Sequence, residues 1–325
     1  MKAIICEQFA PLENLKYTDV PDPIAGAGDV IIDIKAAGVN FPDGLLVQGL
    51  YQVKPPLPFI PGMEFSGVVI EQGAGASHLP NGTRVLGLST GTGAFAERIA
   101  CNPNTLVPIP DAMPHTDAAN LLCAHGTAHH ALKQRGQLQA GETLLVLGAA
   151  GGTGIAAVQI GKAMGARVIA ACSTEEKLAI AKQNGADELI NYSETELKTA
   201  LKELTNGKGV DVVYDPVGGD AFDVCSRAMA RNGRLLVIGF ASGTIPKLPI
   251  NLTLVKEYSV VGVYWGSFTQ HEPAVFADNM KELMGWYSQG KIRLVTDSEF
   301  PLSETSAALA KVMNRDVKGK LVLIP

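Results

Sequence analysis

The sequence predicts an α/β protein of two domains, one rich in β-strands and one built on a doubly wound parallel sheet. Three observations predict this class. Residues up to about 120 alternate β-branched runs with prolines and glycines, a glycine-rich turn follows a short apolar run near residue 148, and strands then alternate with helices. A length of 325 residues is enough for two apolar cores, and the 46% of hydrophobic residues argues against a disordered chain.

The β-rich part is expected to form a partly closed, barrel-like sheet. Its strands are expected over residues 1–9, 29–37, 67–72, 83–88 and 94–99, where β-branched runs lie between turn residues. A helix over 117–132, followed by Gly136, should lead into the second domain.

The second domain begins with a strand, a glycine turn, a helix and a strand. The apolar run Leu144–Leu147 has the composition of a strand buried on both faces. Glycines follow at once, apolar positions continue at helical spacing to Gly165, and Arg167–Cys172 reads as a second buried strand. This order is typical of a dinucleotide-binding unit.

Each glycine of the turn has its own physical role. Gly148 permits a tight turn, Gly151 and Gly152 let backbone amides approach a pyrophosphate, and Gly154 lets the helix pack on the strand. Ala150 stands where a full G-x-G-x-x-G would have its second glycine. In its context the turn predicts a Rossmann domain that binds a nicotinamide cofactor through residues Ala150, Gly151, Gly152, Thr153 and Gly154.

Strands and helices alternate through the rest of this domain. Helices are expected over 174–183, 193–205, 221–230 and 272–290, and strands over 188–192, 211–215, 234–239 and 259–264. The helix from 193 rests on Ser193-Glu-Thr-Glu196, which has the spacing of a capping box. The segment 293–301, a helix over 303–313 and a strand over 319–324 should return to the first domain.

Composition excludes several other classes of protein. A net charge of −5 gives no reason to expect a nucleic-acid partner, and no apolar run is long enough to span a bilayer. The five cysteines are widely spaced and include no C-x-x-C, which favours reduced thiols and a cytoplasmic location.

The end of the second buried strand distinguishes the two nicotinamide cofactors. NAD-specific domains place a carboxylate there to bind the ribose 2′-hydroxyl, but this strand continues into Ser173 and Thr174. Hydroxyls and Lys177, one turn into the next helix, suit the 2′-phosphate of NADPH. Ser173 as a helix cap, Lys177 as a surface charge, and the adjacent pair 175–176 as solvent-facing acids are the alternative interpretations.

Four ordered motifs resemble the quinone oxidoreductases, the zeta-crystallin-like branch of the zinc-independent medium-chain dehydrogenase/reductase superfamily. They are Gly38-Val-Asn40-Phe41-Pro42-Asp43 with Gly49-Leu50-Tyr51, the segment Pro58–Gly67, the segment Val213–Gly218, and Gly319-Lys-Leu-Val-Leu. The resemblance covers essentially the whole chain. It implies a GroES-like catalytic domain, a Rossmann domain, a cleft between them, NADPH as reductant, and homodimers joined through the cofactor domains.

The resemblance also divides the chain and places further site residues. Residues 1–120 would form the first part of the GroES-like catalytic domain, 121–270 the Rossmann NADPH-binding domain, and 271–325 a connecting helix and the return to the catalytic domain. Family members contact the 2′-phosphate at the positions of Lys177 and Tyr192. Residues that would flank the nicotinamide are Thr127, Gly239, Phe240 and Ser242.

Asn40 and Tyr51 are the expected catalytic residues, and the resemblance places both on the substrate side. Asn40 can donate a hydrogen bond to a carbonyl oxygen that gains negative charge, and Tyr51 can do the same or pass a proton. The alternatives are a loop-capping asparagine and a packed core tyrosine. Leu45 stands where some members carry a second tyrosine, which counts against a tyrosine pair as proton donor.

No metal is expected. Zinc-containing relatives have cysteine at the position of Asn40 and histidine at that of Met63, and neither substitute offers a thiolate or an imidazole. His125 and His129 would share a helix face near Cys123, but polar helix residues are the favoured interpretation.

The sequence therefore predicts a zinc-independent oxidoreductase that transfers hydride from NADPH to a quinone. One alternative is an NADPH-dependent reductase of α,β-unsaturated carbonyls, either enals or enoyl thioesters. Another, of a different class, is a non-catalytic NADPH-binding protein with a structural or RNA-associated role. The expected partners are a small quinone or enone and a second copy of the chain, with no nucleic acid and no membrane.

Overall fold

The chain forms two compact units in a computed structural model that describes residues 1–76, 79–89 and 92–325. Unit 1 comprises Met1–Cys123 and Leu294–Pro325, and unit 2 comprises Ala124–Arg293. Helix α10 (Pro273–Ser288), where a helix was expected over 272–290, belongs to unit 2, and the chain is part of unit 1 again from Leu294. His129 holds this helix in unit 2 through a 2.7 Å contact between its Nε2 and Oε2 of Glu282 on α10.

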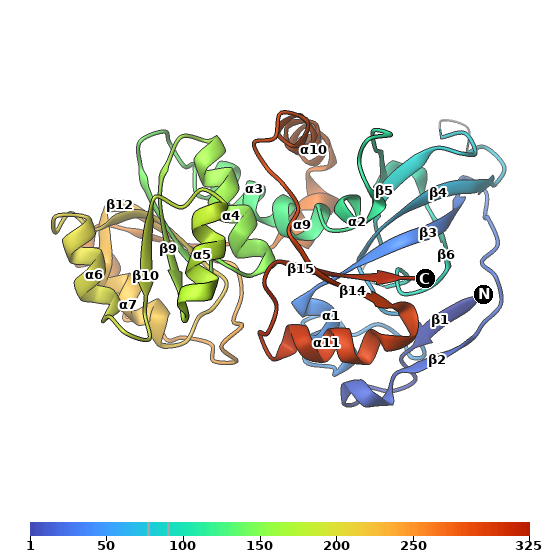
Figure 1. The fold of residues 1–325 in the computed structure, drawn as a ribbon, viewed down its shortest axis with the longest axis horizontal. Coiled ribbons are helices and arrows are strands. Elements are labelled where there is room, and N and C mark those ends of the chain that lie inside the picture. The colour runs from blue at the N-terminus through green and yellow to red at the C-terminus, as the bar shows by residue number, and fades with distance from the viewer. Residues whose placement is uncertain (77–78, 90–91) are drawn as a thin grey trace. The chain divides into compact units, whose positions relative to one another are not determined.

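Unit 1 is organised around strand β3 (Val30–Val39), which is buried along most of its length. The sheet runs in the order β14-β15-β3-β4-β5-β7, with β6 also paired to β3 (Figure 1). Its other strands are β4 (Glu64–Gln72), β5 (Arg84–Leu88), β6 (Arg98–Cys101), β7 (Leu106–Pro108), β14 (Thr296–Pro301) and β15 (Lys320–Ile324). All pairs are antiparallel except β14 with β15, so the end of the chain lies beside β3.

Two irregularities in the pairing of β3 with β4 curve this sheet, one after Ile31 and one after Ile34. The strands β1 (Lys2–Ile5) and β2 (Lys16–Asp19) form a separate antiparallel pair. Two helices, α1 (Phe41–Val47) and α11 (Thr305–Met313), pack closely, since a Cβ on Gly44 would lie 2.5 Å from the sulfur of Met313. Short helical turns are η1 (Leu12–Asn14), η2 (Pro103–Thr105), α2 (His115–Ala118) and η5 (Leu302–Glu304).

Unit 2 is built on a parallel sheet in the order β10-β9-β8-β11-β12-β13. The strands are β8 (Thr143–Leu147), β9 (Arg167–Cys172), β10 (Glu188–Asn191), β11 (Val210–Asp215), β12 (Met229–Val237) and β13 (Ser259–Gly262). All neighbouring pairs are parallel. The chain moves outward from β8 to β10, crosses back to β11, and then moves outward to β13. This confirms the doubly wound α/β fold.

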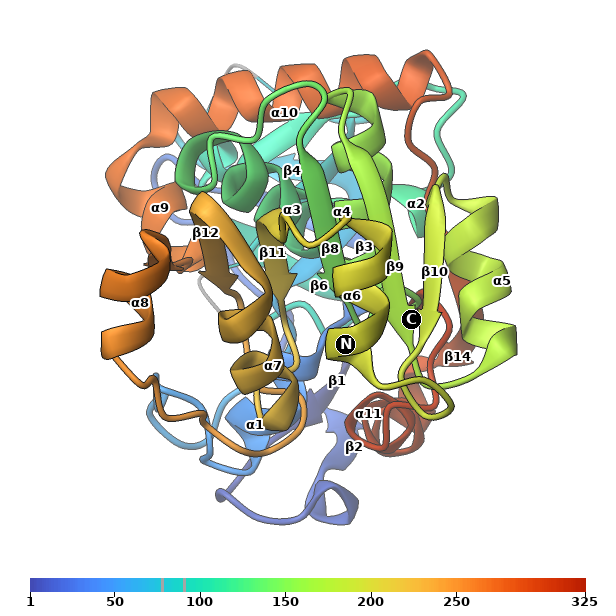
Figure 2. The same cartoon turned by 90° about the vertical axis from the view of Figure 1, so that its left-hand side faces the viewer.

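Helices cover both faces of this sheet (Figure 2). Helices α6 (Leu197–Leu204) and α7 (Asp220–Ala228) pack on one face over alternate residues of the central strands, such as Leu145, Ile169 and Val213. Helix α4 (Gly152–Ala163) contacts β8 and β9 and also α3 (Thr127–His130). The remaining helical elements are η3 (Leu122–Gly126), η4 (Ala131–Arg135), α5 (Glu175–Gln183), α8 (Asn251–Lys256) and α9 (Trp265–His271).

The helix expected over 117–132 is confirmed in part. After α2 and a turn at 119–121, η3, α3 and η4 follow one another without a gap from Leu122 to Arg135, with wider π-type turns in η3 and η4. One local expectation is wrong. The capping box at Ser193 does not form, because the backbone N–H of Ser193 instead donates to the side chain of Asn191 at 3.2 Å. Helix α6 therefore begins only at Leu197, without a side-chain cap. Within the described residues, no helix has the length and apolar character needed to cross a membrane.

Candidate cofactor and substrate sites

The strand order in the sheet of unit 2 reverses between β8 and β11: the chain runs outward to β10 on one side of β8 and outward to β13 on the other. The candidate cofactor residues lie at this point. In doubly wound sheets, ligands bind outside the carboxyl ends of the strands where the strand order reverses. The glycine turn follows β8, Ser173 follows β9, and the loop 239–242 follows β12. Because all these strands are parallel, their carboxyl ends lie at one edge of the sheet.

The glycine turn shows the close backbone approach that its sequence predicts. Gly148 has φ +59°, a left-handed conformation that glycine adopts without strain. A Cβ on Gly154 would lie 2.2 Å from the carbonyl oxygen of Gly148, so the start of α4 packs directly on the turn. A Cβ on Gly151 would have only one neighbour, that same oxygen at 3.5 Å. Gly151 is thus the open side of the turn, where a diphosphate can reach the amides that begin α4.

The side chains beside this turn point toward the sheet. The hydroxyl of Thr153 hydrogen-bonds the hydroxyl of Tyr214, which is fully buried on β11. Ala150 is also buried. Burial raises the pKa of Tyr214, so this phenol stays protonated at neutral pH. Ala150 and Thr153 can therefore offer a phosphate their backbone N–H groups but not a free side chain.

The loops after β11 and β12 are joined by hydrogen bonds. The Oδ1 atom of Asp215 accepts the N–H groups of Val217 and Gly218, each at 2.8 Å. The N–H of Ser242 donates to the carbonyl of Val217 at 2.9 Å. Gly239 and Phe240 lie in the same half-buried loop. Asp215 thus holds the backbone of the loop that follows β11.

The residues expected to contact a 2′-phosphate lie after β9 and β10. Thr174 caps α5, since its hydroxyl accepts the N–H of Lys177 at 3.3 Å; the alternative that Ser173 is this cap is wrong. The carboxylate of Glu175 accepts a hydrogen bond from Asn191 at 2.9 Å, which directs it toward β10. Lys177 is half-buried and Tyr192 is 42% exposed.

The histidines near Thr127, the first residue of α3, do not converge on one point. His125 contacts Gln159, His129 contacts Glu282, and His130 contacts Gln134. Burial lowers the pKa values of His129 and His130. Within the part of the chain that the structure describes, no group of three or more His, Cys, Asp and Glu side chains is arranged to hold a metal ion.

Asn40, the expected catalytic residue of unit 1, lies between β3 and α1 in a buried polar network. Its Nδ2 donates to Oε1 of Glu64 at 2.9 Å, and its Oδ1 accepts from the ammonium of Lys320. The same ammonium contacts Oε1 of Glu64 at 2.8 Å. We call Asn40, Glu64 and Lys320 the Asn40 network. The sequence motifs assign no role to Lys320; the signal that could have found it is a lysine at the start of an otherwise apolar strand.

Two more groups hold this network in place. The Oδ2 atom of Asp43, the third residue of α1, accepts the N–H of Asn40 at 2.8 Å. Oε2 of Glu64 accepts the N–H of Cys123 at 2.8 Å. Burial raises the pKa of Asp43 to about 7, against the smaller opposing effects of Asn40 and Lys320. Burial also raises the pKa of the Cys123 thiol well above its ordinary value.

The network does not fit a zinc ion. Asn40 and Met63 supply neither thiolate nor imidazole, and the oxygen of the Asn40 amide faces an ammonium group. Lys320 therefore provides the positive charge at this position.

Tyr51, the other expected catalytic residue, follows α1 after a turn at Gly49, which has φ +68°. Its ring is half-buried and packs against the apolar core of unit 1. This environment agrees with the packed-tyrosine alternative and leaves the expected catalytic role a prediction.

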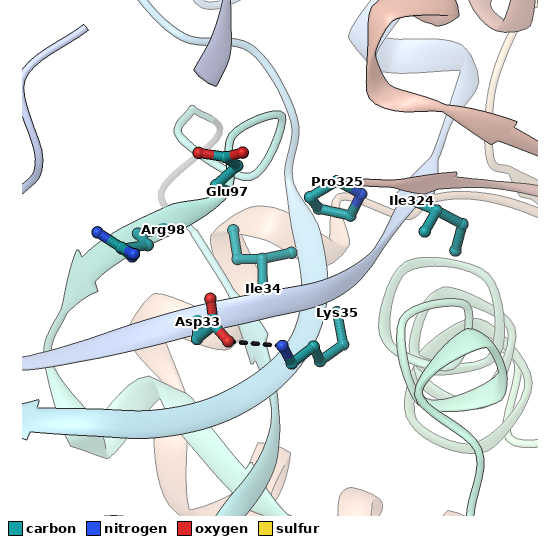
Figure 3. A pocket seen from close by; sticks show the side chains of 7 residues that line it. All are labelled: Asp33, Ile34, Lys35, Glu97, Arg98, Ile324 and Pro325. Carbon is teal, nitrogen blue, oxygen red and sulfur yellow. Dashed lines mark ion pairs between the residues drawn. The ribbon is translucent and has the colours of Figure 1, made fainter. Parts of the chain in front are cut away.

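A surface pocket of about 290 Å³ lies elsewhere in unit 1 (Figure 3). Asp33 and Lys35 of β3 form an ion pair of 2.6 Å at its edge, and Ile324 and Pro325 line its other side. Along β15, the lining residue Ile324 is four residues from Lys320 of the network, roughly 13 Å. The pocket is therefore separate from the Asn40 network.

Comparison with known proteins identifies the family. Residues 152–283 match the zinc-binding dehydrogenase family and residues 26–111 match the alcohol dehydrogenase GroES-like domain. The chain is 43% identical to quinone oxidoreductase-like protein 2 of Rattus norvegicus over 324 residues, covering 99% of this chain and 91% of that protein. The chain belongs to the quinone oxidoreductase family of the medium-chain dehydrogenases/reductases.

Solved structures of this family have the same fold. A quinone oxidoreductase of Pseudomonas syringae pv. Tomato DC3000 matches with a TM-score of 0.93 at 31% identity, covering 100% of this chain and 99% of that chain. The Escherichia coli quinone oxidoreductase, solved in complex with NADPH, matches with a TM-score of 0.92 at 28% identity, covering 100% of each chain. The predicted family, the GroES-like domain and the Rossmann domain are thereby confirmed.

Proposed function

We propose that this oxidoreductase transfers hydride from NADPH to a quinone without zinc. The main support for the proposal is the open glycine turn after β8, at the point where the strand order reverses. The residues that follow β9 are hydroxyl-bearing Ser173 and Thr174, where an NAD-specific domain would have a carboxylate. The family relation and the NADPH complex of the Escherichia coli relative support it.

The fit to NADPH rests on the described residues of unit 2. A diphosphate would meet the backbone N–H groups that begin α4, on the side of the turn that Gly151 leaves open. A 2′-phosphate would meet Ser173, Thr174 and the ammonium of Lys177, while Glu175 is directed away by Asn191. Thr127 and the loop 239–242 would flank the nicotinamide ring.

The reaction converts a quinone, NADPH and one proton into a hydroquinone and NADP⁺. NADPH supplies the hydride, which carries two electrons to the quinone ring. One quinone oxygen gains negative charge, and we propose that the Nδ2–H of Asn40 donates to this oxygen. The proton comes from water. Lys320 and Glu64 balance each other's charge beside Asn40, which suits a neutral acceptor.

We also propose a cytoplasmic homodimer. Four apolar side chains of unit 2 are more than 70% exposed, on and beside α8: Ile245, Ile250, Leu254 and Val255. The neighbouring strand β13 lies at the edge of the sheet, where strands present unpaired backbone groups. A second copy would cover both features. The cytoplasmic location rests on the cysteine pattern.

The experiment is a panel of electron acceptors, with NADPH oxidation followed by its absorbance. Turnover of quinones, and weaker binding of NADH than of NADPH, is the expected result. Turnover of enals or enoyl thioesters in place of quinones would replace the proposed substrate with the α,β-unsaturated carbonyl class. Tight NADPH binding without turnover of any acceptor would support the non-catalytic alternative.

The variant Asn40→Ala tests the catalytic residue. A hydrogen bond to a charged group contributes about 1.5 to 3 kcal/mol, so kcat should fall roughly ten- to a hundredfold while the Kd for NADPH is unchanged. An unaltered kcat would refute the role of Asn40.

A further inference from the structure

The Asn40 side chain, at the N-cap of α1, contacts two charged partners from distant parts of the chain. The ammonium of Lys320 can only donate, so it requires the Oδ1 atom of Asn40 on its side. The Glu64 carboxylate, which accepts from Lys320, receives the Nδ2 hydrogen of Asn40 at 2.9 Å. Rotating the amide by 180° would place oxygen against carboxylate and nitrogen against ammonium.

This pair of charges is almost completely buried. The side chain of Lys320 is 8% exposed and that of Glu64 is 1% exposed. The third ammonium contact is the carbonyl oxygen of Val39 at 3.0 Å, so the three N–H donors of Lys320 have three acceptors. Buried ion pairs add little net stability compared with apolar residues of similar volume, so stability alone does not explain this pair.

The same arrangement leaves one donor of Asn40 weakly engaged. The Asn40 amide has two N–H groups, and one of them donates to Glu64. For the other, the acceptor is the carbonyl oxygen of Gly38, which is 3.5 Å from Nδ2, at the limit of a hydrogen bond. Asn40 is also partly exposed. A fixed amide with one weakly held N–H is suited to donate to an oxygen outside the network. The ammonium on Oδ1 polarises the amide and strengthens that donor.

We propose that Lys320 and Glu64 are positioning residues, which fix the Asn40 amide so that one N–H faces the reacting carbonyl oxygen. Neither residue touches the substrate in this proposal, and both act through Asn40. The kinetic part rests on the proposed quinone reductase function. The orientation of the amide does not, so it can be tested separately.

The test removes both charges together, because removing one alone would leave its partner buried and unpaired. The variant Lys320→Met/Glu64→Gln keeps the volume of both side chains. Its matched control, Lys311→Met/Asp297→Asn, removes a partly buried ion pair of 2.5 Å elsewhere in unit 1. Each double variant is combined with Asn40→Ala, and kcat, KM for a quinone and Kd for NADPH are measured for all forms.

If Lys320 and Glu64 act through Asn40, the losses in kcat caused by Lys320→Met/Glu64→Gln and by Asn40→Ala should not be additive. The Lys320→Met/Glu64→Gln variant should lose about tenfold or more in kcat with an unchanged NADPH Kd, and Asn40→Ala should then cause little further loss. In the Lys311→Met/Asp297→Asn background, Asn40→Ala should cost as much as in the wild type. Unchanged kcat in the Lys320→Met/Glu64→Gln variant, or an undiminished Asn40→Ala effect in it, would overturn the proposal.

A second measurement does not depend on activity. The two side-chain amide protons of Asn40 give a pair of ¹H–¹⁵N NMR signals, which can be assigned by their loss in Asn40→Ala. In the wild type one proton should exchange slowly with solvent, and in Lys320→Met/Glu64→Gln both should exchange quickly. Equal exchange in the two proteins would overturn the positioning role. A wild type that reduces no acceptor yet shows the protected proton would refute the proposed function while supporting the fixed orientation.

Discussion

The closest backbone contact at the cofactor turn gives a sharp prediction about Gly154. A Cβ at this position would lie 2.2 Å from the carbonyl oxygen of Gly148 and 2.8 Å from the Cα of Ala149. Both are backbone atoms, so neither can move aside by changing a rotamer. Gly154→Ala should therefore force α4 away from the turn.

The two opposing effects of Gly154→Ala can be weighed. Overpacking costs about 3 kcal/mol at the upper end of its usual range. Alanine regains about 1 kcal/mol through its higher helix propensity. The net loss of about 2 kcal/mol should lower the melting temperature of a unit of this size by roughly 4 to 8 °C.

Gly151→Ala, three residues earlier in the same turn, is the matched control. Its Cβ would lie 3.5 Å from the nearest atom, an ordinary contact, and its φ of −80° suits any residue. The melting temperature should not change, but the added methyl group occupies the side open to the diphosphate. NADPH affinity, measured by fluorescence titration, should fall about tenfold, or 1.4 kcal/mol. A Gly154→Ala protein that melts with the wild type, or a Gly151→Ala protein that binds NADPH normally, would refute this account of the turn.

Three further predictions concern other parts of the chain. Burial raises the pKa of Asp43 to about 7 from its ordinary 3.8, so the folded protein keeps a proton that the unfolded chain releases, and stability falls as pH rises between these values. Asp43→Asn should remove this fall, about 3 kcal/mol between pH 5 and pH 8, in urea unfolding at those two pH values; an equal pH dependence in both proteins would contradict the prediction. Lys177→Met should weaken NADPH binding about tenfold and leave NADH binding unchanged, whereas Lys182→Met, from the last turn of α5, should affect neither. Leu254 is 79% exposed, so Leu254→Glu should convert a dimer to a folded monomer in size-exclusion chromatography; a wild type that elutes as a monomer would count against the dimer.

The parallel sheet could be predicted from the sequence because its signals are local and agree with one another. Strands such as β8 and β9 are uninterrupted apolar runs, and the glycines between them allow few structures other than the observed turn. The right-handed crossover fixes the hand of each strand–helix–strand unit. The order of the strands, with β11 returning beside β8, comes from the structure.

Local competition explains where these predictions are wrong. The sequence Ser193–Glu196 has the spacing of a capping box, but Asn191 lies two residues earlier and its side chain takes the N–H of Ser193. The backbone carbonyl oxygen of Asn191 also accepts the N–H groups of Glu194 and Thr195. Short polar side chains can offer the backbone such alternatives to a helix. Helix α1 was missed for a different reason: it has only seven residues, too few for a helical period to show.

The partners of Asn40 in the candidate catalytic site could not be predicted from a local sequence pattern. Asn40 can be found from its motif, but Glu64 lies 24 residues away from it and Lys320 lies 280 residues away. A lysine at the start of an apolar strand indicates a buried charge that needs a partner, without identifying the partner. The antiparallel pairing of β15 with β3 supplies the answer, because Leu321 lies opposite Val39 and so brings Lys320 to Asn40.

The charges in this network also favour one kind of substrate. Lys320 and Glu64 form a pair, and burial keeps Asp43 largely protonated below about pH 7, so the groups around Asn40 sum to almost no charge. An anionic acceptor would need a cationic side chain in the network that is free to bind it. The ammonium of Lys320 already donates to three acceptors within the protein. A neutral quinone needs no such charge in its ground state. It needs a donor only as its oxygen becomes negative during hydride transfer, and a polarised amide held in one orientation can supply that donor.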